Sequence, residues 1–117
     1  MSELAAWPAP HCPLAQFRTF ESVETIRHYL HNAIADCEEY LAALHATTPD
    51  VTDPANRRLL HQLEGQFKSF DHLTGYTACR SILDTSETAV NPAALATLVA
   101  SANDLLSLLR SQPELTA

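Results

Sequence analysis

The chain has 117 residues, 46% of them hydrophobic and only two of them glycine, which suits one domain with one core and favours helices over a turn-rich β fold. Its formal net charge of −7, from 14 acidic and 7 basic residues, argues against nucleic acid or an anionic membrane surface as the main partner. No apolar run approaches the roughly 20 residues of a membrane-spanning helix, and the N-terminus does not resemble a signal peptide.

Three widely spaced cysteines, Cys12, Cys37 and Cys79, match neither a zinc pattern nor a disulfide framework. Reduced and mostly buried thiols are typical of a cytoplasmic protein, which is the location we expect.

Residues 1–13 are expected to form an irregular segment, because Pro8, Pro10 and Pro13 each bias the preceding residue away from helix. Trp7 either packs back on the rest of the chain or lies in a mobile tail, and the sequence leaves both open. Residues 14–20 can form a short lead-in helix.

Residues 21–46 show the longest helical pattern. Their apolar residues recur at spacings of three and four: Val23, Ile26, Leu30, Ala33, Ile34, Cys37, Leu41 and Leu44. His28, His31 and His45 border or oppose this stripe, without the acidic partners at matching spacing that di-iron helical bundles use. We therefore expect these histidines to be solvated or to lie at the boundary of the core.

The next helix is predicted at 54–70, after a loop at 46–53, because Asp53 suits the N-cap and Pro54 the first helical position. One face of this helix is apolar, with Leu59, Leu60, Leu63, Phe67 and Phe70, and the opposite face carries His61 together with Arg57, Glu64, Gly65 and Lys68. Glycine costs about 1 kcal/mol relative to alanine inside a helix. Gly65, one turn after His61, therefore suggests close approach of another molecule, while a tolerated helix glycine and a close contact between helices are the alternatives.

The last two helices are predicted at 72–83 and 92–110. Asp71 is expected to cap the first, with Leu73, Tyr76, Cys79, Ile82 and Leu83 facing the core; without a break before it, His72 would share the His61 surface. A polar loop at 84–90 leads to Asn91 and Pro92, again an N-cap pair, and Ser111 onward is expected to fray.

Four amphipathic helices with short loops predict an all-α protein, an antiparallel up-down four-helix bundle over residues 14–111 with a tail at 112–117. Its predicted core consists of Leu30, Ile34, Leu41, Leu60, Leu63, Phe67, Phe70, Ile82, Leu98, Leu105 and Leu106.

The run His61-Gln62-Leu63-Glu64-Gly65 resembles the His-x-Leu-Lys-Gly signature of histidine-containing phosphotransfer (HPt) domains of bacterial two-component phosphorelays. Residues 53–60 match the family's pattern before the histidine, in which an Asp is followed several residues later by Leu and small apolar residues. Cys79 stands where the family often has a small residue or cysteine. The resemblance covers roughly residues 20–110. It departs from the family at Glu64, which replaces the lysine, and at Asp71, which replaces a second glycine at the end of the same helix.

The resemblance implies a phosphocarrier rather than a turnover enzyme. His61 would accept a phosphoryl group from an aspartate of a receiver domain and pass it to another receiver, since an exposed imidazole is largely neutral and nucleophilic near pH 7. Partners would be response-regulator receiver domains or a hybrid sensor kinase, and the protein itself would be a monomer. No cofactor is expected on this chain, because the receiver supplies Mg²⁺.

The sequence does not decide which cation would stabilise a phosphoryl group on His61. Glu64 would repel a phosphoryl group, whereas Lys68 and Arg57 could replace the family lysine. Arg57, Glu64 and Lys68 could equally form a solvated ion network that adds little stability.

Two alternatives remain beside phosphotransfer. The first is a degenerate HPt-like interaction module that docks a receiver or kinase without accepting phosphate, as Glu64 and Asp71 would suggest. The second and weaker alternative is a helical metal-binding bundle, which would need inward-facing histidines among His28, His31, His45, His61 and His72.

Overall fold

The computed structural model describes residues 7–46, 51–84 and 91–116. These residues form α1 (Pro13–Phe20), α2 (Val23–Ala46), α3 (Pro54–Ser69), α4 (Leu73–Leu83), α5 (Pro92–Arg110) and a short 3₁₀ helix, η2 (Pro113–Leu115). The described residues contain no strand, so the protein is all-α, as the sequence predicts. Most of the two predicted loops, residues 47–50 and 85–90, lies outside the described residues.

Helices α2 to α5 each begin at a side-chain cap. Asp53 Oδ1 accepts a hydrogen bond from the Ala55 N–H at 2.9 Å, and Asn91 Oδ1 accepts one from the Ala93 N–H at 2.8 Å, which confirms both predicted caps. The predicted start of α2 at residue 21 is wrong by two residues, because the Ser22 hydroxyl accepts a hydrogen bond from the Thr25 N–H at 3.1 Å and marks the helix start.

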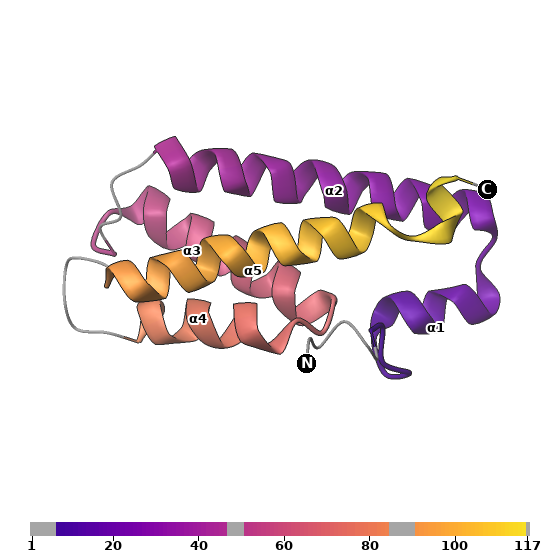
Figure 1. Ribbon diagram of the computed structural model, residues 1–117, viewed down its shortest axis with the longest axis horizontal. Coiled ribbons are helices and arrows are strands. Elements are labelled where there is room, and N and C mark those ends of the chain that lie inside the picture. Colours follow the sequence, from indigo (N-terminus) through magenta and orange to yellow (C-terminus); the bar gives the residue numbers. More distant parts are fainter. Residues whose placement is uncertain (1–6, 47–50, 85–90, 117) are drawn as a thin grey trace.

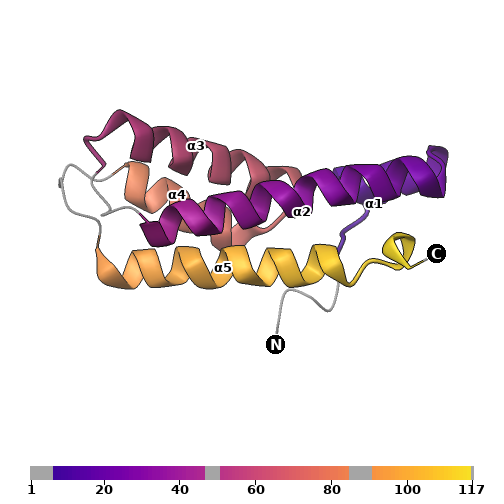
Figure 2. The same cartoon turned by 90° about the horizontal axis from the view of Figure 1, so that it is seen from above.

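The four longer helices, α2 to α5, run in alternating directions along the long axis of the molecule (Figure 1). Along the chain each packs on the next, and α5 returns to pack on α2. Seen from above, α3 and α5 lie on opposite sides of the molecule, and α1 lies against the first half of α2 (Figure 2). The apolar stripes of these helices therefore converge on a common core.

Most of the predicted core is confirmed. The buried members are Leu30, Leu41, Leu60, Leu63, Phe67, Phe70, Ile82, Leu98, Leu105 and Leu106. Ile34 is only partly buried at the core's edge, so its predicted place in the core is wrong. Val23 and Leu73, also predicted to face the core, are 49% and 68% exposed, because each is the first residue of its helix, where the chain has just turned.

The chain reverses between α3 and α4 at Asp71. Asp71 has φ 55°, in the left-handed region that glycine adopts freely and aspartate tolerates better than most residues. The prediction that Asp71 caps α4 is wrong. His72 is the N-cap residue, and its Nδ1 accepts a hydrogen bond from the Gly75 N–H at 3.1 Å. The break buries His72, so this imidazole does not share the surface of His61.

The segment after α5 is not a frayed tail, contrary to the prediction. Glu114 is buried, and both of its carboxylate oxygens accept hydrogen bonds from Arg18 of α1, at 2.6 and 2.7 Å. Arg18 also donates to Gln112 at 2.5 Å, and Arg27 Nε of α2 donates to the Glu114 carbonyl at 2.9 Å. These polar contacts join the C-terminal segment to α1 and α2. They could not be predicted from the sequence, because this segment has no apolar periodicity.

Residues 7–12, here called the N-terminal strap, contact the end of α3. The Trp7 Nε1–H donates to the Phe70 carbonyl at 2.5 Å, Cys12 Sγ lies 3.9 Å from the Ser69 carbonyl, and His11 pairs with Asp71 at 3.0 Å. Of the two alternatives for Trp7, packing back on the helices is therefore the one observed.

Within the described residues, α5 is the one helix long and apolar enough to cross a membrane by length and composition. Its buried residues face α2 and α4. A helix that is packed in a protein core meets the same criteria of length and composition.

Candidate functional site

The candidate site is the outward face of α3. This helix buries Leu59, Leu60, Leu63 and Phe67 and leaves His61 exposed near its middle. The predicted exposure of His61 is thus confirmed, and its imidazole is accessible to a second molecule.

Gly65 lies one turn after His61 and borders open space. A Cβ atom built on Gly65 would meet nothing within 4 Å, whereas one built on Gly75 would lie 2.4 Å from the Phe67 ring. Gly75 is therefore required by the packing of α4 on α3. Gly65 is not explained by a contact between helices, which leaves close approach of another molecule and a tolerated helix glycine as the two remaining explanations.

Glu64 turns away from the centre of the His61 surface towards α4. Its Oε2 lies 3.0 Å from Arg80 Nη1, and Arg80 Nη2 lies 2.5 Å from Asp84 Oδ1. The hydrogen bond to Glu64 raises the pKa of Arg80, which stays charged. Glu64 pairs with Arg80 and not with Arg57 or Lys68, so the alternative of an Arg57–Glu64–Lys68 network does not hold in the described residues. The predicted solvated position of Glu64 is wrong, because its side chain is only 19% exposed.

Arg57 and Lys68 are both exposed, and neither has an acidic partner in the described part of the chain. Lys68 lies seven residues after His61, about 10 Å along the helix axis. It borders a hollow of about 250 Å³ between α3 and α4 that Phe67, Asp71, His72, Leu73 and Tyr76 also line.

Asp71 stands where the resembled family has its second glycine. Its positive φ is the backbone conformation for which glycine is favoured at a helix end. The departure from the family at Asp71 therefore changes a side chain and leaves the reversal of the chain in place.

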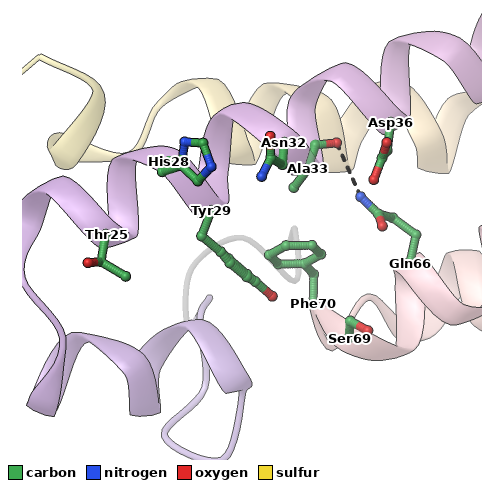
Figure 3. A pocket seen from close by; sticks show the side chains of 9 residues that line it. All are labelled: Thr25, His28, Tyr29, Asn32, Ala33, Asp36, Gln66, Ser69 and Phe70. Carbon is green, nitrogen blue, oxygen red and sulfur yellow. Dashed lines mark hydrogen bonds between the residues drawn. The ribbon is translucent and has the colours of Figure 1, made fainter.

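A second hollow, of about 430 Å³, lies between α2 and the last turn of α3 (Figure 3). Its lining comes from α2 and from the end of α3: Thr25, His28, Tyr29, Asn32, Ala33, Asp36, Gln66, Ser69 and Phe70. Gln66 Nε2 spans the two helices by donating to the Ala33 carbonyl at 3.2 Å. The sequence does not predict this hollow, because helical periodicity assigns residues to faces of a helix but does not show which helix lies opposite each face.

The histidines do not assemble into a metal centre in the ranges that the structure describes. His28, His31, His45 and His61 are exposed, and these ranges hold no group of three His, Cys, Asp or Glu side chains fit to bind a metal ion.

His72 is the one inward-facing histidine of the set, and its ring nitrogens already have partners. Its Nε2 lies 2.8 Å from Asp104 Oδ2 of α5, while Nδ1 caps α4. Because Nδ1 accepts a hydrogen bond, the proton of the neutral ring lies on Nε2 and is donated to Asp104.

Comparisons with protein-family models, curated proteins and solved structures find no match to this chain. The family resemblance around His61 therefore stays a prediction from its residues.

Proposed function

We propose that this protein is a cytoplasmic histidine phosphotransfer protein whose α2 to α5 form an antiparallel up-down four-helix bundle, with His61 as phosphoacceptor. The observation that supports it best is an exposed His61 in the middle of α3, opposite a buried stripe and beside an open Gly65. A receiver domain needs an unobstructed surface around the imidazole, so that its aspartyl phosphate can be placed in line with the attacking ring nitrogen of His61.

The chemistry is a single displacement at phosphorus. The lone pair of one ring nitrogen of His61 forms the N–P bond as the bond between phosphorus and the aspartyl oxygen of the receiver breaks, leaving a carboxylate there. The proton on the other ring nitrogen stays or leaves to water. Reversal onto a second receiver completes the relay, so the protein carries the phosphoryl group without net turnover.

Mg²⁺ belongs to the receiver in this proposal and neutralises charge on the phosphoryl group during transfer. Lys68 and Arg57 are cations on the same face of α3 and add to the local positive charge. The partners are receiver domains or a hybrid sensor kinase, and the phosphocarrier acts as a monomer that binds neither nucleic acid nor membrane.

The test is phosphotransfer from purified receiver domains of the same genome, charged with radiolabelled acetyl phosphate and Mg²⁺. Acid-labile label should appear on the protein and should be lost in His61→Ala, while the matched control His31→Ala, which removes an exposed histidine of α2, keeps it. Label that survives His61→Ala, or that moves to His72, would refute the assignment.

A second candidate is an HPt-like docking module that accepts no phosphate. It is favoured by Glu64, a carboxylate at the family's lysine position that Arg80 holds in place. If no receiver labels the protein but one binds it, and an added side chain in Gly65→Leu weakens that binding at least tenfold, the docking module replaces the phosphocarrier.

A further inference from the structure

Arg80 brings a cation from α4 to the side of the His61 surface. Its Nη1 contacts Glu64 at 3.0 Å and its Nη2 contacts Asp84 at 2.5 Å. The sequence does not point to Arg80, because this residue lies 19 residues after His61 and on another helix.

The contact with Glu64 fixes where the guanidinium lies. Glu64 is three residues after His61, which places the two Cβ atoms about 5–6 Å apart on the helix surface. A guanidinium nitrogen within hydrogen-bond distance of the Glu64 carboxylate therefore lies on the α4 side of the His61 surface, the side from which Arg80 can turn towards a phosphoryl group on His61. The Arg80 side chain is 39% exposed, so this movement is open to it.

Arg80 also has donors to spare. A guanidinium has five N–H groups in a planar fork, and the two contacts with Glu64 and Asp84 use different nitrogens. Phosphoryl oxygens fit this fork in pairs, more closely than they fit a lysine ammonium. The Asp84 side chain is 62% exposed, and such a surface ion pair is weak, so a phosphoryl group can replace Asp84 at little cost.

We propose, on the basis of the function proposed above, that Arg80 binds the phosphoryl group on His61 and takes the part of the family lysine from the neighbouring helix. Glu64 is a positioning residue that aims Arg80. In the transfer step Arg80 forms no covalent bond. It exchanges its hydrogen bond to Asp84 for bonds to phosphoryl oxygens, while the N–P bond forms and the aspartyl O–P bond of the receiver breaks.

The experiment measures the yield and half-life of phosphohistidine at position 61, after phosphorylation both by receivers and by phosphoramidate, which needs no receiver. Arg80→Ala should lower the yield or shorten the half-life about tenfold, the effect expected of one charge-assisted hydrogen bond. Arg80→Lys should restore part of this loss, and Asp84→Ala should match or exceed wild type. Arg110→Ala is the matched control, because Arg110 is an arginine of α5 that pairs with Glu38 of α2 and not with a residue of α3 or α4.

A double variant separates contact from simple neutralisation. If Arg80 binds the phosphoryl group, Glu64→Gln combined with Arg80→Ala stays as impaired as Arg80→Ala alone. If Arg80 only cancels the charge of Glu64, the double variant recovers to wild-type yield, and the proposal is overturned.

The two proposals fail in different ways. Wild-type yield in Arg80→Ala would overturn the role of Arg80 and leave His61 as phosphoacceptor. Absence of phosphohistidine in the wild type with every receiver and with phosphoramidate would overturn both.

Discussion

At the scale of single residues, the two glycines have opposite roles that their sequence positions do not reveal. Both lie inside helices, but Gly65 borders open space and Gly75 lies against Phe67. Gly65→Ala should raise the free energy of unfolding by up to about 1 kcal/mol through helix propensity. Gly75→Ala should lower it by about 1–3 kcal/mol, because the ring of Phe67 must shift. Urea denaturation followed by circular dichroism measures both.

The same glycine variant also tests the proposed docking. If a receiver must approach closely at Gly65, Gly65→Ala should slow phosphotransfer from receivers while leaving labelling by phosphoramidate unchanged. Equal slowing of both reactions would show that the methyl group disturbs His61 itself rather than the approach of the partner.

His72 is a structural histidine, and its replacement should cost stability. His72→Ala removes the acceptor for the Gly75 N–H and the donor to Asp104, so the free energy of unfolding should fall by about 2–4 kcal/mol. His72→Asn should cost less, because asparagine is a good N-cap. His31→Ala, at an exposed position of α2, should stay within about 0.5 kcal/mol of wild type. A His72→Ala variant as stable as that control would show that the cap is not needed.

At the scale of elements, the pairing of Arg18 with Glu114 holds α1 and the C-terminal segment together. The hydrogen bond from Arg18 lowers the pKa of Glu114 below its ordinary value of 4.5. A carboxyl group with a depressed folded pKa adds stability that is fully present above the unfolded value and is lost as pH falls through the folded value. Thermal melts should therefore show wild type losing stability below about pH 5 more steeply than Glu114→Gln. Parallel curves for the two proteins would mean that this ion pair adds nothing.

The elements were also what the sequence predicted best. Asp53 with Pro54 and Asn91 with Pro92 are local signals, and α3 and α5 begin where these pairs stand. The exposure of His61 follows from the same periodicity. The partner of Glu64 could not be predicted, because it depends on the face that α4 turns towards α3. The positions of Gln112 and Glu114 depend on single polar contacts with distant helices, which leave no repeat in the sequence.

At the scale of the whole molecule, all three cysteines are free and buried. Burial raises the pKa of Cys12 and Cys37 and raises that of Cys79 to about 12, so none presents a thiolate near pH 7. An aromatic disulfide reagent should react with the native protein at least ~100-fold more slowly than with protein in denaturant, because reaction requires opening of the fold. One rapidly modified thiol in the native protein would show that a part of the core opens easily.

The contact between Trp7 and the end of α3 gives the protein an optical reporter. Trp7 is the single tryptophan of the chain, and its indole donates to Phe70 and lies 6.4 Å from that ring. Its fluorescence emission should therefore change when the N-terminal strap or the α3–α4 turn is displaced. It should not respond to structural changes at the distant ends of α2 and α5. An emission change that precedes the loss of helical ellipticity on denaturation would then record release of the strap from helices that are still folded.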